Sequence, residues 1–283
     1  MKRTIWIALA LSLVLLAACS KTGGKETSAR TDGHGTEHGS EHGGHEEGGG
    51  AAAADATRAV WKLSAAKPQA GAVTTVSVQV EDKNGKPVEA FDISHEKMMH
   101  LIVISKDLSY FDHIHPEYKG NGRFDIDTRF PAGGEYKLYA DYVPKGGSTV
   151  TKSEWIRVEG NAAASVPVTP DANLVKAVDG KEVKLSIDGL AAGKDASLTF
   201  HIADEKTKQP ITDLQPYLGA VGHVVIVSGD AEQYLHVHPT EEKAKGPDAK
   251  FMTKFPNSGV YKIWGQFQHN GKTFIVPFVV KVP

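Results

Sequence analysis

Short runs of alternating apolar and polar residues recur along most of the chain. In one of them Val76, Val78 and Val80 alternate with polar residues, which is the period of a half-buried β-strand. Turn-forming sequences such as residues 82–85 separate the runs. About seven such runs precede residue 160 and a similar order follows it, a pattern typical of immunoglobulin-type sandwiches. The sequence therefore predicts an all-β protein with two tandem immunoglobulin-like antiparallel β-sandwich domains.

A three-histidine motif occurs twice, and corresponding histidines are 123 residues apart. The first copy contains His100, His113 and His115, and the second contains His223, His236 and His238. In each copy the last two histidines are two residues apart, so their side chains would leave a strand from the same face. If the first histidine lies on an adjacent strand, three nitrogen donors can meet, and such a set suits copper or zinc. Each repeat is therefore predicted to hold a three-histidine metal site.

Two alternatives remain open for these residues. The histidines could be structural, with imidazoles bonded to the backbone at a strand end, and a duplication would copy that scaffold too. In the first copy Met98 would share a face with His100, and its thioether sulfur would favour Cu(I) as a further ligand. The alternative for Met98 and Met99 is that they fill the core.

The N-terminus has the pattern of a lipoprotein signal peptide over residues 1–18. Lys2 and Arg3 precede an apolar run that is too short to remain as a membrane span. Residues 16–19 resemble a bacterial lipobox, which implies cleavage before Cys19 and attachment of lipid, including palmitate, to that residue. Cys19 is the only cysteine, so no disulfide is expected.

Residues 19–58 are rich in glycine, glutamate and histidine and are predicted to form a disordered linker. Its four glycine-flanked histidines could bind metal loosely or simply belong to a solvated spacer; they are His34, His38, His42 and His45. The folded domains are predicted at 59–160 and 173–283, with a second linker at 161–172.

Charge and motifs argue against two functional classes. The formal net charge is −2, so the chain gives no reason to expect nucleic acid as a partner. We find no nucleophile paired with a base, no phosphate-binding glycine loop and no carboxylate pair suited to acid–base catalysis. A binding protein is therefore expected, with a three-histidine metalloenzyme as the alternative.

Segments 99–103, 110–117, 217–223 and 235–239 carry the histidine motifs. They resemble segments of uncharacterised bacterial secreted proteins and lipoproteins that are similar to the YtkA/FixH-like immunoglobulin-type domains. The resemblance implies an envelope protein with sandwich domains, of a kind associated with copper handling. It implies no catalytic residue.

These observations predict an extracytoplasmic metal-binding lipoprotein, anchored by lipid to a bacterial membrane, that buffers, delivers or confers resistance to copper. Zinc is the second choice of metal, and another envelope protein is a candidate partner. Because neutral imidazole is the competent ligand, metal affinity is expected to fall below about pH 6.5. The alternative function is a non-metal adhesion or assembly module of the cell envelope.

Overall fold

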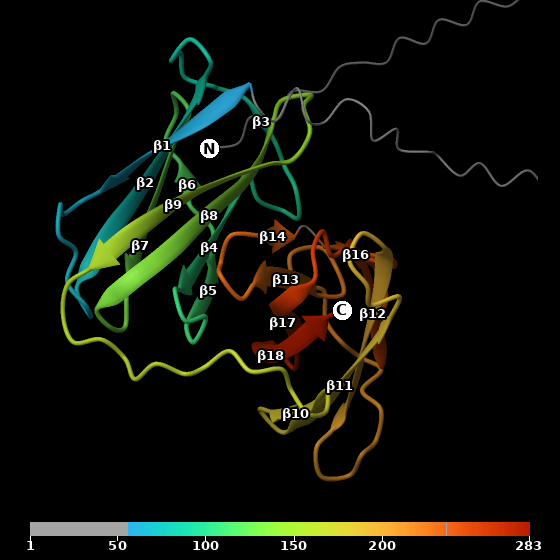
Figure 1. Cartoon of the computed structure of the whole chain (residues 1–283). Coiled ribbons are helices and arrows are strands. Elements are labelled where there is room, and N and C mark those ends of the chain that lie inside the picture. The colour runs from blue at the N-terminus through green and yellow to red at the C-terminus, as the bar shows by residue number, and fades with distance from the viewer. Residues whose placement is uncertain (1–55, 236) are drawn as a thin grey trace, which may run out of the picture. The chain divides into compact units, whose positions relative to one another are not determined.

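The computed structural model describes residues 56–235 and 237–283, and for His238 it describes the backbone alone. These residues form two β-sandwiches, the first repeat and the second repeat, which belong to one compact unit (Figure 1). The predicted signal peptide, Cys19 and the four linker histidines lie outside the described residues. So do His236 and the side chain of His238. No helix long and apolar enough to cross a membrane occurs in the described part of the chain.

The first repeat consists of two antiparallel sheets. Its strands are β1 (Thr57–Leu63), β2 (Val73–Asp82), β3 (Phe91–Asp92), β4 (Met99–Ser105), β5 (Phe111–Ile114), β6 (Glu117–Tyr118), β7 (Arg123–Arg129), β8 (Gly134–Pro144) and β9 (Val150–Val158). One sheet has the order β1-β2-β7-β6. The other has the order β3-β8-β4-β5, and β8 also pairs with β9. This strand order is that of an immunoglobulin sandwich.

The second repeat has the same arrangement except that one edge strand is added and β3 has no counterpart. Its strands are β10 (Val175–Val178), β11 (Lys181–Asp188), β12 (Asp195–Asp204), β13 (His223–Ser228), β14 (Tyr234–Leu235), β15 (His238–Pro239), β16 (Asp248–Lys254), β17 (Gly259–His269) and β18 (Lys272–Val282). The sheets have the orders β10-β11-β12-β16-β15 and β14-β13-β17-β18, and β10 is the added edge strand. The predicted all-β class with two immunoglobulin-like sandwiches is confirmed.

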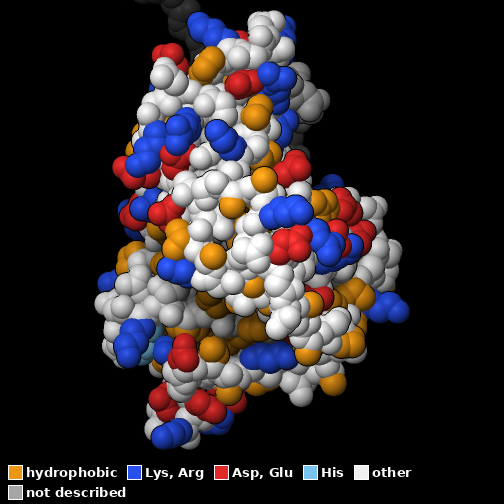
Figure 2. All heavy atoms as spheres, turned by 90° about the vertical axis from the view of Figure 1, so that its left-hand side faces the viewer, with side chains coloured by type: hydrophobic (Ala, Val, Ile, Leu, Met, Phe, Trp, Pro, Cys, Tyr) orange, Lys and Arg blue, Asp and Glu red, His pale blue; other side chains and the backbone are white. Residues whose placement is uncertain are grey.

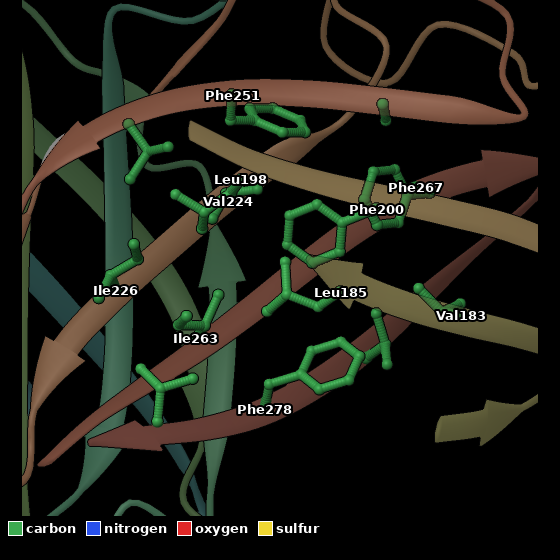
Figure 3. Packing of buried hydrophobic residues seen from close by; sticks show 14 of the residues in the cluster. Val183, Leu185, Leu198, Phe200, Val224, Ile226, Phe251, Ile263, Phe267 and Phe278 are labelled. Atoms are coloured by element: carbon green, nitrogen blue, oxygen red, sulfur yellow. The ribbon is translucent and has the colours of Figure 1, made fainter. Parts of the chain in front are cut away.

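Each sandwich has its own core. In the first repeat Val76, Val78 and Val80 are fully buried between the sheets, as their alternation predicts. In the second repeat aromatic rings fill the equivalent space (Figure 3). The ring centroids of Phe200 and Phe267, for example, are 5.3 Å apart. Burial of these apolar faces supplies the main stabilisation of each repeat.

Strands β4 and β13 are buried on both faces. In β4, Leu101 and Val103 pack in the core of the first repeat, whereas Ile102 packs against the second repeat. We call the shared apolar group the inter-repeat cluster; its buried members are Ile102, Ile104, Leu108, Tyr139, Val225, Val227, Ala231 and Trp264. The unbroken apolar runs 101–104 and 224–227 follow from this burial, because a strand covered on both faces has no polar side.

Polar contacts accompany the inter-repeat cluster. The buried ammonium of Lys137 lies 2.7 Å from the carboxylate of Glu232 in the second repeat. Lys262 of β17 donates a hydrogen bond of 2.7 Å to the backbone carbonyl of Leu108. The Tyr139 hydroxyl donates to the carbonyl of Ala231. Because buried donors must find acceptors, these bonds fix one arrangement of the two repeats.

Charged side chains of both signs are interspersed on the face of the molecule shown in Figure 2. Partly exposed ion pairs such as Arg58 with Glu81 and Arg123 with Asp125 occur in the first repeat. Exposed pairs of this kind stabilise a fold only slightly. No large patch of one sign is visible on that face.

Gly222 lies where a side chain has no room. A Cβ atom there would lie 2.4 Å from Cδ1 of Phe267 and 2.7 Å from the carbonyl oxygen of Gln266. Phe267 is fully buried, so it cannot move aside without repacking the core. We expect Gly222→Ala to lower the free energy of unfolding by about 1–3 kcal/mol, measured by chemical denaturation.

Gly229 provides the matched control for this substitution. A Cβ atom at Gly229 would meet no atom closer than 3.4 Å, which is an ordinary contact. Gly229→Ala is therefore expected to change the free energy of unfolding by less than about 0.5 kcal/mol. Equal losses at Gly222 and Gly229 would contradict the steric argument.

Candidate metal centre

Strand pairing places the first two histidines of the first repeat on one face. His100 has the parity of Ile102 in β4, so its side chain leaves the strand on the face of the inter-repeat cluster. His113 of β5 is the register partner of Ile102, and opposite residues on paired strands share a face. His115 follows β5 directly, two residues after His113.

The three imidazoles of the first repeat meet at one place. One ring nitrogen from each of His100, His113 and His115 can be chosen so that all three lie within 4.8 Å of one another. The ring centroids are separated by 5.2, 5.0 and 4.8 Å. Imidazoles bound tetrahedrally to one ion through bonds of about 2.0–2.1 Å would have centroids about 5 Å apart. The spacing of the rings therefore fits a single ion.

The hydrogen bonds define which nitrogens face each other. Nε2 of His100 lies 2.9 Å from the carbonyl oxygen of Ser94, which can only accept, so this nitrogen carries the proton. Nδ1 of His100 then accepts from Nε2 of His113 at 3.0 Å. Nδ1 of His113 in turn accepts from the side-chain amide of Gln266, also at 3.0 Å. A bound ion would replace the proton that Nε2 of His113 donates to Nδ1 of His100.

This geometry also supplies an outer hydrogen bond for a ligand. A metal-binding imidazole usually donates its second N–H to a carbonyl or carboxylate, which fixes the ring. His100 already donates to Ser94 in this way. The side chain of His100 is enclosed, with 8% of the residue exposed, so the ring has little freedom to turn away.

Two imidazoles of the site, those of His113 and His115, are held neutral. Burial lowers the pKa of His113 well below 6.5, and the neighbouring histidines act in the same direction. Burial, with smaller effects from His100 and Lys97, lowers the pKa of His115 to about 4. At neutral pH these rings carry lone pairs that are free of competing protons. The ordinary pKa of 6.5, on which the sequence-based expectation of the pH dependence rests, does not apply here.

The second repeat contributes a histidine to the same neighbourhood. The His223 ring centroid lies 6.0 Å from that of His100 and 5.8 Å from that of His113. Burial lowers the pKa of His223 to about 3, with further lowering by His95 and His100. His236 and the side chain of His238 lie outside the described residues, so the predicted second three-histidine site stays a prediction.

The two methionines before His100 have different environments. Met99 is fully buried in the core of the first repeat. Met98 is 38% exposed and precedes the start of β4. The assignment of Met98 as a copper ligand stays a prediction, and the donor set described by the structure consists of nitrogen.

Residues outside the two predicted histidine sets also shape the site. Gln266 is 1% exposed and contacts His113, and the carbonyl of Ser94 contacts His100. His95 has a positive φ of 46° and brings its ring centroid within 4.7 Å of that of His223. Gln266 in β17 is the register partner of His223, a pairing that only the structure reveals.

Comparison with family models gives a match to each repeat. The model of a domain of unknown function, DUF8832, matches residues 53–160 and 176–283. The similarity to YtkA/FixH-like domains stays a prediction, since the matching model is a different one. No curated protein matches the chain in sequence.

Several solved structures are similar to the chain at low sequence identity and low TM-score. The Escherichia coli adhesin FdeC is 14% identical with a TM-score of 0.28; the match covers 81% of this chain and 65% of FdeC. The Yersinia pseudotuberculosis adhesin InvE is 12% identical with a TM-score of 0.24, covering 78% of this chain and 58% of InvE. A two-domain fibronectin type-III segment of chicken tenascin is 13% identical with a TM-score of 0.23, covering 78% of this chain and 97% of the segment. The chain thus spans less than two thirds of either adhesin.

Proposed function

We propose that the first repeat of this chain, which belongs to the family of the domain of unknown function DUF8832, binds a metal ion. The ligands are His100, His113 and His115. The protein is then a binding protein of the bacterial cell envelope, lipid-anchored at Cys19, that buffers, delivers or detoxifies the ion. The single observation that carries this proposal is the convergence of the three imidazoles, with their nitrogens within 4.8 Å.

The chemistry of the donor set supports copper first and zinc second. Neutral imidazole serves Cu(I), Cu(II) and Zn(II). The only cysteine of the chain is Cys19, which the lipid anchor would occupy, so no thiolate is available to the site. Copper is preferred because the proposed location is extracytoplasmic and the histidine motifs resemble those of copper-associated envelope proteins.

Two buried atoms favour an ion over a purely structural role. Nε2 of His115 is buried without a hydrogen-bond partner, as is Nε2 of His223. An unsatisfied buried polar atom costs about 1–3 kcal/mol, and a structural histidine would be expected to avoid that cost. A bound ion would satisfy such a nitrogen directly.

The test is a metal-binding measurement on a chain whose four linker histidines are replaced by alanine, so that loose binding there does not contribute. We expect this parent chain to bind copper in the described domains. His113→Ala is expected to weaken copper binding by at least about 100-fold, which corresponds to about 2.7 kcal/mol. Metal content by mass spectrometry and titration against a competing chelator give the two readouts.

His201→Ala is the matched control for His113→Ala. His201 is an exposed strand histidine that hydrogen-bonds Asp248 and lies in the second repeat. Its loss is expected to leave copper affinity unchanged. If both variants bind copper as the parent does, or if the parent binds neither copper nor zinc, the proposal fails. The adhesion or assembly module would then be the better hypothesis, and it is also the class to which FdeC and InvE belong.

A further inference from the structure

The ring of His223 faces the first-repeat histidines although it belongs to the second repeat. His223 has the parity of Val225 and Val227 in β13, which are both buried in the inter-repeat cluster. Its side chain therefore leaves β13 toward the first repeat. The ring centroids of His100 and His113 lie 6.0 and 5.8 Å from that of His223.

One nitrogen of His223 is prepared to bind a ligand. A backbone hydrogen bond with Leu218 engages the ring, whereas Nε2 is buried without any hydrogen-bond partner. The engaged nitrogen must then be Nδ1. A ring whose Nδ1–H is held by a backbone carbonyl presents the lone pair of Nε2, and this is how metal-binding histidines are commonly oriented.

A small cavity lies among these rings. It has a volume of about 40 Å³ and is lined by residues of both repeats, including His95, His100, His113, His223 and Asp141. Such a volume is enough for one small guest, an ion or a water molecule, provided that polar partners surround it. Here the partners are imidazoles and one carboxylate.

Gln266 of the second repeat provides an orienting group. If Nε2 of His113 binds an ion, Nδ1 of the same ring must carry the proton and needs an acceptor. The Gln266 side-chain amide lies 3.0 Å from this Nδ1. Amide oxygen and nitrogen exchange places when the group is turned over, so Gln266 can offer its oxygen as the acceptor.

We propose that the metal site is composite: the second repeat supplies His223 as a fourth imidazole and Gln266 as the positioning residue for His113, so one ion joins the two repeats. This inference rests on the proposed function, because it requires that the three histidines of the first repeat bind an ion. It differs from the sequence-based prediction of one independent site in each repeat.

The experiment measures Zn²⁺ affinity by chelator competition on the full chain with the four linker histidines replaced by alanine in every sample. His223→Ala is expected to keep the stoichiometry of the strongest site at one ion and to weaken that site by at least about tenfold, because losing a direct ligand should cost no less than losing an outer-shell partner. His201→Ala serves as the control in the same repeat. Unchanged affinity in His223→Ala overturns the composite site.

Gln266 variants test the orienting role by a pattern of loss and rescue. Gln266→Leu removes the acceptor and is expected to weaken Zn²⁺ binding by about tenfold, whereas Gln266→Glu keeps an acceptor and is expected to retain affinity. Thermal unfolding of each variant without metal separates a folding defect from a binding defect. Equal losses of affinity in both variants, with unchanged metal-free unfolding, would overturn the role of Gln266.

The two proposals fail in different ways. If the parent chain binds no Zn²⁺ or copper, the proposed function fails and the composite site fails with it. If the parent binds an ion that His113→Ala removes and His223→Ala does not affect, the proposed function stands and the composite site alone is overturned. A second ion of equal affinity, lost in His223→Ala while the first is retained, would also overturn it.

Discussion

Replacing Trp264 by alanine is expected to lower the free energy of unfolding by about 3–5 kcal/mol, the usual cost of removing a buried tryptophan. Trp264 is 3% exposed and belongs to the inter-repeat cluster. Its ring stacks on Phe111 of the first repeat, with centroids 4.7 Å apart and an interplanar angle of 16°. No other side chain of the inter-repeat cluster is larger, so its removal should also weaken the coupling between the repeats.

Calorimetry and near-ultraviolet circular dichroism measure both effects. We expect one unfolding transition in the unaltered chain and two in Trp264→Ala, because the repeats then unfold separately. Trp61→Ala is the matched control, since Trp61 packs partly buried against the core of the first repeat and outside the inter-repeat cluster. It should lower stability without dividing the transition. A loss below about 1 kcal/mol for Trp264→Ala would show that the contact contributes little.

Much of the fold and part of the site could be predicted from strand periodicity. The alternation of Val76, Val78 and Val80 indicates a half-buried strand, and these residues do lie in the core. The two-residue spacing of His113 and His115 predicts a shared face, and their ring centroids lie 4.8 Å apart. Such local inferences succeed because side-chain direction in a strand depends on the backbone alone.

The contribution of the second repeat could not be predicted in the same way. Whether His223 and Gln266 approach His113 depends on how two sheets pack against each other, and periodicity within one strand carries no information on that. One signal was present in the runs 101–104 and 224–227, whose continuous apolar character indicates burial on both faces. With this signal, the parity of His100 and His223 places both on the outer, shared face.

The protonation of the site also depends on tertiary structure. From the sequence alone, the expected pKa of a histidine is the ordinary value near 6.5. The pKa of His223 falls to about 3 because burial removes the water that would stabilise the charged ring. This pKa shift arises from the packing of the repeats, so the local sequence around His223 does not predict it.

Metal-free protein is expected to lose about 3 kcal/mol of unfolding free energy between pH 6.5 and 4.5 because of these histidines. In the unfolded chain His113, His115 and His223 have ordinary pKa values and take up protons as the pH falls below 6.5. In the folded state their pKa values are lowered, to about 4 for His115 and about 3 for His223, so they stay neutral. The unfolded state then binds more protons and is favoured as the pH decreases.

This difference in proton uptake sets the direction of the stability change and the pH range in which it occurs. A group with a lowered pKa contributes its full stability above its unfolded pKa and loses it as the pH falls toward the folded value. The slope is about 1.4 kcal/mol per pH unit for each proton bound only by the unfolded state. The expected loss of unfolding free energy is well below the sum of the losses for three independent histidines, because solvent screens the partly exposed His115 and the rings interact.

Urea denaturation at several pH values measures the effect, and a substitution identifies its source. In His223→Gln the loss between pH 6.5 and 4.5 should be smaller by about 1 kcal/mol or more, because one of the contributing rings is absent. His201→Gln, which removes a histidine bonded to Asp248 outside the cluster, is the matched control. Carboxylates contribute only at the acid end of this window, because groups with lowered pKa values, such as Asp107 and Asp230, lose their stabilising effect as the unfolded chain takes up carboxyl protons, mostly below about pH 5. A flat profile from pH 6.5 to 4.5 would mean that the cluster accepts protons in the folded state, and the neutral donor set described for the metal centre would then be wrong.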